Sequence, residues 1–164
     1  MFMTTTLLKR GQSSLMQLRN FSLVNASQLG SINRDQVLNA PDTKWIGSYA
    51  KAIIENGDSS GQHGDALNEY MRKKFRKLST EQAMDIINSI GEEPKEEPAA
   101  CLDGQFWVWE TLEAAVRPEI DTMSEDDFYS CWKVFARHYK GSQDLVDLVE
   151  QRMYTESDIF EGDK

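Results

Sequence analysis

Apolar side chains recur along this chain at intervals of three and four residues, and the pattern itself repeats. A shift of 45 residues brings each apolar position of segment 67–90 onto an apolar position of segment 112–135. A shift of 37 residues finds a partial third copy, in which Ile46, Tyr49, Ala50 and Ile53 fall on Ala83, Ile86, Ile87 and Ile90. Such spacing is typical of amphipathic helices, and a repeat of this length is typical of stacked helix pairs. The apolar pairs at the longer shift are Leu67 and Leu112, Met71 and Val116, Phe75 and Ile120, Leu78 and Met123, Ala83 and Phe128, Ile86 and Cys131, Ile87 and Trp132, and Ile90 and Phe135.

Good helix-capping residues stand at matching places in the three copies. Asp42, Ser79 and Ser124 align with one another, each just before an apolar stretch, where an Asp or Ser side chain accepts from backbone N–H groups of the first turn. No segment alternates at strand length, so we expect an all-α fold, a short α-solenoid of about three helical hairpins. The predicted helices cover residues 42–56, 65–77, 79–90, 101–117, 124–139 and 143–154.

Composition divides the chain into four parts. Residues 1–21 are expected to be a mitochondrial transit peptide or a basic N-terminal arm, and residues 22–41 a linker or extended arm. Residues 42–154 form the helical-repeat domain, and residues 155–164 an acidic tail. Within the domain, residues 91–99 are acidic and contain two prolines, which predicts a linker between two helices.

The transit-peptide hypothesis depends on an abrupt change in charge. Residues 1–34 contain Lys9, Arg10, Arg19 and Arg34 but no acid, and the first acid is Asp35. A basic, hydroxyl-rich, amphipathic start is typical of mitochondrial presequences. The run 19–22, Arg-Asn-Phe-Ser, resembles the pattern cut by the matrix processing protease. We therefore expect a mitochondrial protein, in the matrix or at the matrix face of the inner membrane. The alternative is an arm that stays attached and docks on a partner.

The overall charge limits the classes of partner. The chain carries 27 acidic and 18 basic residues, for a formal net charge of −9. Such a chain repels phosphate backbones, so RNA is not expected as the main partner, whereas basic protein surfaces are favoured. No apolar stretch approaches the roughly 20 residues of a membrane span, so no transmembrane helix is expected.

The usual catalytic and metal-binding patterns are missing from the sequence. It contains no GxSxG, HExxH, Walker A or Rossmann pattern. His63 and His138 have no Cys or His neighbours at metal-ligand spacing. Cys101 and Cys131 form no CxxC pair, so free thiols are favoured over a disulfide, and Cys131 aligns with an apolar core position. These observations predict a protein that is not an enzyme and needs no cofactor.

Two clusters are candidates for binding a partner. The first is a basic strip of Arg72, Lys73, Lys74, Arg76 and Lys77. It is either a docking strip for an anionic surface, such as an acidic subunit, cardiolipin headgroups or RNA, or a solvated helix face.

The second candidate cluster consists of Phe106, Trp107 and Trp109. Neighbouring helical positions point about 100° apart, so these rings cannot all face one core. They either anchor a partner or belong to a central helix that is buried on two sides.

The segment from Leu112 to Met153 resembles the helical repeats of organellar proteins. Ser-Glu-Asp-Asp-Phe opens one helix, and Val-Phe-Ala-Arg precedes a turn, in the manner of octotricopeptide repeats and of the repeats found upstream of RAP domains. The resemblance extends over roughly residues 42–154 and rests on apolar spacing and caps. It implies organellar RNA handling, but this chain is shorter and more acidic than those families and lacks a RAP-like C-terminal strand module.

Together these features predict a non-catalytic accessory or structural subunit of a large mitochondrial complex. A respiratory-chain complex or an ATP synthase assembly is the expected setting, with other protein subunits as partners. The alternative is an RNA-facing helical-repeat protein, such as a mitoribosomal subunit, with the basic strip contacting phosphates.

Overall fold

Every regular element of the structure is helical. The structure, a computed structural model, describes residues 22–91, 100–137 and 140–162, and no strand occurs in these ranges. The all-α prediction is therefore confirmed. In chain order the elements are the 3-10 helix η1 (Ala26–Ser31), α2 (Arg34–Leu38), α3 (Thr43–Asn56), α4 (Gln62–Lys73), α5 (Thr80–Gly91), η2 (Ala100–Leu102), α6 (Phe106–Val116), η3 (Arg117–Glu119), α7 (Glu125–Cys131), the π-helical η4 (Trp132–Ala136) and α8 (Gln143–Gly162).

The three aligned capping residues begin three of these helices, as predicted. Asp42 accepts from the backbone N–H three residues on at 2.8 Å, and Ser124 does the same at 3.2 Å. Ser79 accepts from the N–H of Gln82 at 3.1 Å, while the Gln82 side chain accepts from the N–H of Ser79 at 3.0 Å. Each cap satisfies a donor that has no partner within its helix, which is worth about 1 kcal/mol.

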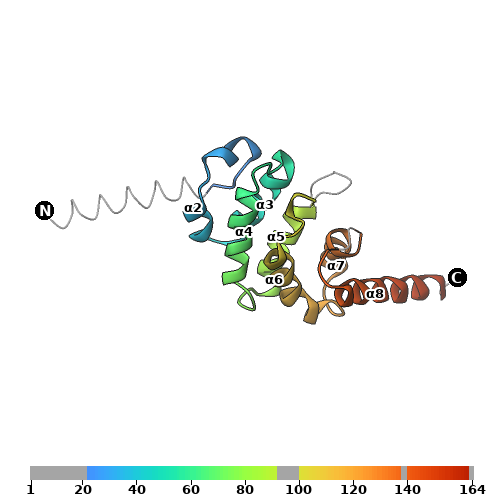
Figure 1. Ribbon diagram of the computed structural model, residues 1–164. Coiled ribbons are helices and arrows are strands. Elements are labelled where there is room, and N and C mark those ends of the chain that lie inside the picture. Colours follow the sequence, from blue (N-terminus) through green and yellow to red (C-terminus); the bar gives the residue numbers. More distant parts are fainter. Residues whose placement is uncertain (1–21, 92–99, 138–139, 163–164) are drawn as a thin grey trace, which may run out of the picture.

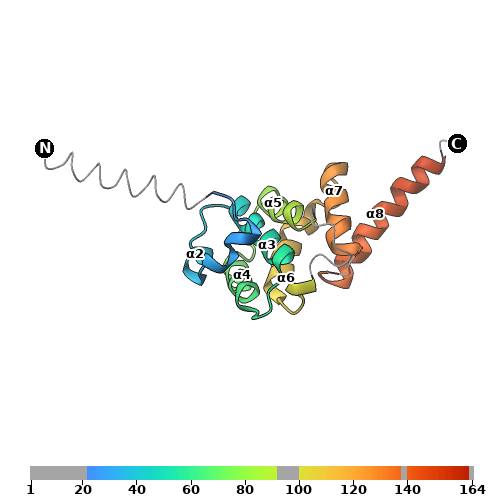
Figure 2. The same cartoon turned by 90° about the horizontal axis from the view of Figure 1, so that it is seen from above.

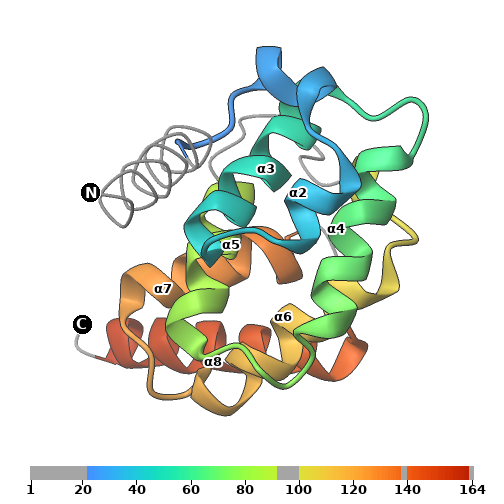
Figure 3. The ribbon, with the colours of Figure 1, turned by 90° about the vertical axis from the view of Figure 1, so that its left-hand side faces the viewer.

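The helices form two rows. In the first row α3 packs most extensively on α5, and α5 packs on α7. In the second row α4 packs on α6. Figure 3 looks along both rows, with α3, α5 and α7 to one side of α4 and α6. The apolar positions that align at the two shifts are buried or half-buried, so the repeated pattern builds the core between the rows.

The same relation extends to the last helix. A shift of 37 residues places the apolar face of α6 on that of α8, pairing Val108 with Leu145, Leu112 with Val149 and Val116 with Met153. Two different shifts occur because the connections within the helix pairs differ in length. They cover residues 57–61 between α3 and α4 and 137–142 between η4 and α8, but 92–105 between α5 and α6.

Two side chains 45 residues apart bind the first turn of the next helix: Asn68 on α4 binds the start of α6, and Glu113 on α6 binds the segment just before α8. The side-chain amide oxygen of Asn68 on α4 accepts from the backbone N–H groups of Trp107 at 2.8 Å and Val108 at 3.2 Å, at the start of α6. The Glu113 carboxylate on α6 accepts from Ser142 just before α8, from the N–H at 2.6 Å and the hydroxyl at 2.8 Å. Helix N-termini attract such acceptors because their N–H groups are unpaired and carry partial positive charge.

The expected extended arm at residues 22–41 is wrong, because this segment contains η1 and α2. Asn33 and Gln36 form a capping box at the start of α2, with bonds of 2.9 and 2.8 Å. Leu29 and Val37 are buried, and the two short helices cover α3 and α4 respectively. Helices of five or six residues are too short to show a helical period in the sequence.

Other helix boundaries also differ from those expected. Helix α4 ends at Lys73, and residues 74–77 form a turn in which Arg76 has a φ of 61°. The expected separate tail after residue 154 is part of α8, which runs to Gly162 because no glycine or proline interrupts it earlier. Figures 1 and 2 show α2 and α8 at opposite ends of the molecule, with α8 projecting past α7. The presumed presequence 1–21, the linker residues 92–99 and His138 lie outside the described residues.

None of the described helices combines the length and apolar content that a membrane crossing requires.

We expect Gly47→Ala to destabilise the protein, because α3 and α5 approach closely at this residue. A Cβ at position 47 would lie 2.9 Å from the backbone oxygen of Asp85 and 2.6 Å from Ser89 Oγ. Overpacking costs about 1–3 kcal/mol, offset by about 1 kcal/mol of helix propensity, so a net loss of roughly 1–2 kcal/mol should appear in urea unfolding followed by circular dichroism. Gly30→Ala is the matched control, since a Cβ there meets nothing within 4 Å. Equal stability of both variants would contradict the close approach.

Glu113→Ala should loosen the attachment of α8. Removing the carboxylate leaves the N–H of Ser142 without its acceptor, at a cost of about 1–3 kcal/mol in unfolding free energy. Hydrogen exchange should also accelerate selectively in the first turn of α8. Glu110→Ala, on the same helix but less buried, should change stability by no more than about 0.5 kcal/mol. Unchanged exchange in α8 would show that this carboxylate does not hold the helix.

Candidate functional site

The basic strip lies at the end of α4 and in the turn that follows. All five of its cationic side chains are exposed: Arg72, Lys73, Lys74, Arg76 and Lys77. The first two occupy the last turn of α4, where positive charge complements the helix dipole. Two of the others form cation–π contacts. Lys74 Nζ lies 5.7 Å from the centre of the Tyr70 ring, and the Arg76 guanidinium lies 5.1 Å from the centre of the Phe75 ring.

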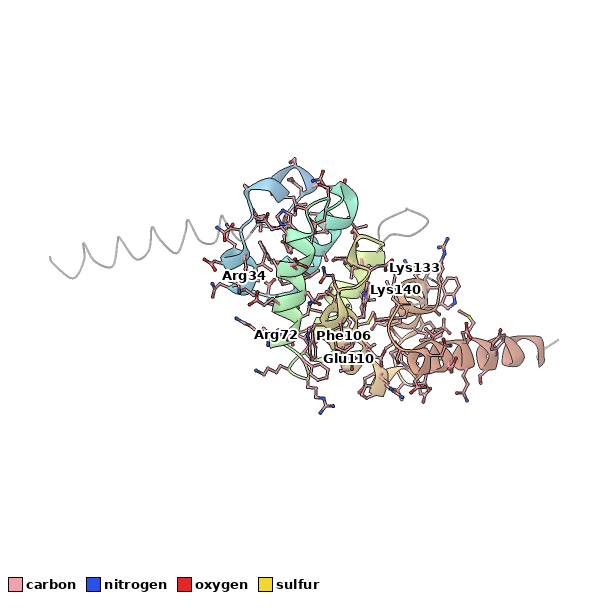
Figure 4. All side chains as sticks on the ribbon, viewed as in Figure 1. Arg34, Arg72, Phe106, Glu110, Lys133 and Lys140 are labelled. Carbon is pink, nitrogen blue, oxygen red and sulfur yellow. The ribbon has the colours of Figure 1, made fainter. Side chains whose placement is uncertain are left out.

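Phe75 connects the strip to the start of α6. Its ring meets Trp107 edge-on at 5.3 Å, and Trp107 meets Phe106 edge-on at 5.0 Å. Phe106 is 59% exposed, whereas Phe75 and Trp107 are half-buried beneath the cations. We call the five cations together with these three rings the basic-aromatic surface. Figure 4 marks Arg72 on α4 and Phe106 on the neighbouring α6.

Trp109 does not belong to this surface. It is only 8% exposed, its indole N–H donates to the carbonyl of Leu102 at 3.1 Å, and its ring lies edge-on to Phe135. The aromatic run is therefore divided as helical geometry requires, with Phe106 facing solvent and Trp109 facing the core. Of the three aromatic candidates for partner binding, Trp109 therefore exposes the least surface, because its ring packs against Phe135 of the η4 segment.

The basic-aromatic surface is a positive region on an acidic protein. The nearby acid Glu69 is bound by Arg34 of α2, whose Nε–H donates to one carboxylate oxygen at 2.7 Å and whose Nη2 donates to the other. This hydrogen bond lowers the pKa of Glu69, and the positive charges of Lys73 and Arg72 lower it further. The carboxylate is thus paired directly with Arg34 of α2 and not with a cation of the strip.

Phe106 also borders a groove on its other side. The groove has a volume of about 520 Å³ and lies between the start of α6 and the segment before α8. Lys140 spans it, paired with Asp103 and positioned 5.9 Å from the centre of the Trp109 ring. A partner that covers Phe106 therefore reaches a groove whose walls are partly charged. Its main lining residues are Asp103, Phe106, Trp109, Glu110, Lys140 and Ser142.

His63, which lies in the described part of the chain, has a structural partner. His63 Nδ1 is hydrogen-bonded to the Tyr49 hydroxyl at 2.8 Å, and burial raises the pKa of Tyr49 well above its ordinary value. Asp58 accepts from the N–H of Gly64, in the first turn of α4, at 2.7 Å. Within the described part of the chain, no three His, Cys, Asp or Glu side chains gather as metal ligands would.

Both cysteines are present as thiols, and Cys131 is a core residue as its alignment predicted. Its sulfur lies 3.7 Å from the sulfur of Met84 and 3.9 Å from that of Met123. Burial raises the pKa of the Cys131 thiol to about 12, which suppresses the thiolate and with it any nucleophilic role.

The sequence analysis missed one stacked aromatic pair, the exposed Tyr129 on α7 and the half-buried Trp132 on η4. The rings stack with their centres 5.7 Å apart, and Tyr129 is 53% exposed. The 45-residue shift could have identified this pair, because it aligns Tyr129 with Met84. Met84 is buried, so the shift marks position 129 as one that a neighbouring helix would cover.

Thiol labelling should distinguish the two cysteines. In the native protein at pH 8, we expect at most one equivalent of thiol to react with an aromatic disulfide reagent, from the half-buried Cys101. Cys131 should react at least about a hundredfold more slowly than a free thiol, because its thiolate is scarce and its sulfur is inaccessible. Raising the pH to 9 should not release it, whereas urea should expose both thiols. A Cys101→Ser variant isolates the slow thiol, and rapid labelling of that variant would refute its burial.

Comparison of the chain with protein-family models, with curated proteins and with solved structures found no match. The function is therefore inferred from the chemistry of the basic-aromatic surface and from the way the helices stack.

Proposed function

We propose that this protein is a non-catalytic accessory subunit of a large mitochondrial assembly, which binds an acidic protein partner through the basic-aromatic surface. The observation that carries the proposal is the continuity of five exposed cations with the exposed ring of Phe106. At many protein interfaces an aromatic ring of one protein fills a pocket of its partner, and charged groups surround the ring.

The scaffold of this surface is, we infer, a short α-solenoid of three helical hairpins: α3 with α4, α5 with α6, and α7 and η4 with α8. Three observations support it: the two rows of helices, the shifts of 37 and 45 residues that relate successive pairs, and the matching roles of Asn68 and Glu113. Solenoids present extended surfaces built from several repeats. The basic-aromatic surface fits this description, since it joins α4 of one pair to α6 of the next.

An acidic protein is favoured as the partner because of the distribution of charge. The chain as a whole carries a net charge of −9, so a strip of five cations attracts anionic groups only at short range. A folded acidic surface supplies such groups together with a pocket for Phe106. Cardiolipin headgroups offer the same negative charge at the matrix face of the inner membrane and remain a second contact for the strip.

The mitochondrial setting rests on the acid-free N-terminal segment with its basic residues Lys9, Arg10 and Arg19. In this setting a respiratory-chain complex or an ATP synthase assembly is the proposed host, and the protein acts as a scaffold between neighbouring subunits.

An RNA-facing role is the second candidate, favoured by one observation. An exposed aromatic ring beside several cations is the arrangement on which unpaired bases stack while phosphates are neutralised. The acidic remainder of the protein opposes it, so it ranks below the protein partner.

Charge reversal on the strip should separate these possibilities. We expect the full chain, and its Lys44→Glu variant on the exposed face of α3, to co-migrate with a high-mass complex on native gels of mitochondria. The Arg72→Glu/Lys74→Glu variant and Phe106→Ala should migrate free, with unchanged circular dichroism. Migration of the unaltered protein as a free monomer would refute the proposal.

Filter binding tests the RNA alternative directly. The purified chain is mixed with a single-stranded RNA oligonucleotide at about 50 and 200 mM salt. Binding that falls steeply with salt and disappears in Arg72→Glu/Lys74→Glu would favour the RNA-facing role, because each neutralised phosphate adds to the salt dependence. We expect no such binding. Vesicles with and without cardiolipin, assayed with the same variants, show whether the lipid contributes.

A further inference from the structure

We propose that the outer face of α7 and η4 is a self-complementary surface that pairs with a second copy of this chain about a two-fold axis. The face is formed by Glu125, Tyr129, Trp132, Lys133 and Arg137. This inference depends on the helix stacking and not on the basic-aromatic surface, so either can fail without the other.

Equivalent positions on the first row of helices identify the face. Gly47 on α3 lies against α5, and the 37-residue shift takes it to Met84 on α5. The sulfur of Met84 contacts that of Cys131 on α7, and the 45-residue shift takes Met84 to Tyr129. In α3 and α5 this position meets the next helix of the row. On α7 the same position holds an aromatic ring that is 53% exposed.

The two ends of the rows differ. At the N-terminal end, η1 covers α3 and α2 covers α4, and most side chains of these short helices are exposed polar groups. Capping elements of this kind keep stacked helical repeats from associating end to end. At the other end the stacked rings of Tyr129 and Trp132 lie on the outer face of α7, with Lys133 Nζ 5.1 Å from the centre of the Tyr129 ring. Because the N-terminal end is already covered, head-to-tail assembly is disfavoured. The open end is therefore expected to pair with the same end of a second copy.

The π-helical turn keeps these residues on one face. In four residues an α-helix advances slightly more than one turn, whereas a π-helix advances slightly less. The helix type changes at Trp132, whose carbonyl accepts from the N–H of Arg137 at 2.9 Å. The smaller rotation per residue in the π-helical turn therefore offsets the excess rotation that accumulates along α7. Positions 125, 129, 133 and 137 consequently stay aligned along α7 and η4.

The charges on this face identify the occupant. Exposed acid stands at one end, Glu125 and Asp126, and basic side chains stand at the other, Lys133 and Arg137. An antiparallel second copy places Glu125 of each chain opposite Arg137 of the other and brings the two Tyr129 rings together near the axis. A partner of uniform charge would meet repulsion at one end, whereas an identical face meets attraction at both. Figure 4 shows Lys133 on this side of the molecule, away from Arg72.

Reciprocal charge reversal gives a sharp test. In sedimentation velocity on the full chain, we expect a monomer–dimer equilibrium at concentrations of about 1–100 µM, as suits a small interface. Glu125→Arg and Arg137→Glu should each weaken dimerisation at least about tenfold, because like charges then face each other twice. Mixed in equal amounts, the two variants should form a heterodimer, since both cross-axis pairs are again opposite in sign. The double variant should dimerise with itself for the same reason.

Controls and contrary outcomes are equally specific. Arg72→Glu, at the other surface, should leave dimerisation unchanged, and Tyr129→Ser should weaken it. Recovery on mixing excludes misfolding as the cause of the single-variant losses. A chain that stays monomeric at about 100 µM, a dimer indifferent to both reversals, or single variants that fail to combine would each overturn the proposal.

Discussion

A pair of amphipathic helices cannot cover its own apolar face, so each pair in this structure depends on neighbouring helices to bury that face. Helix α5 is the clearest case, since Ile86, Ile87 and Ile90 are fully buried between α3 and α7. At one end the constraint is met by two short helices that each bury one apolar side chain, Leu29 in η1 and Val37 in α2. At the other end, the outer face of α7 and η4 keeps the ring of Tyr129 53% exposed.

Stacking buries helix ends as well as apolar faces, and the polar residues of the interior follow from this. A helix that starts between two others cannot leave its first N–H groups to water, so a neighbouring helix must supply the acceptor. Asn68 does so for α6, and the Glu113 carboxylate for α8. Glu113 is only 6% exposed, yet it has Ser142 as a donor and Arg117 at 3.7 Å, which offsets the cost of burying its charge.

Local patterns in the sequence predicted the parts of the structure that local physics determines. The caps at Asp42, Ser79 and Ser124, the apolar faces and the exposure of the basic strip depend on residues within one or two turns. Contacts between distant segments had no such signal: Phe75 meets Trp107 across 32 positions, and which side of α6 is covered depends on where η4 lies. The helices η1 and α2 were missed because a single turn shows no period, although Asn33 and Gln36 carried a capping pattern.

The two surfaces lie on different elements, and this separation has a consequence for binding. The basic-aromatic surface belongs to α4 and α6, whereas the proposed two-fold face belongs to α7 and η4. Pairing of two chains therefore leaves both basic-aromatic surfaces free. A dimer would present two such surfaces in a fixed relation, and a second contact to the same assembly then occurs at high effective concentration. Weak individual contacts, each limited by salt screening of exposed cations, would in this way add up to stable attachment of a chain with a net negative charge.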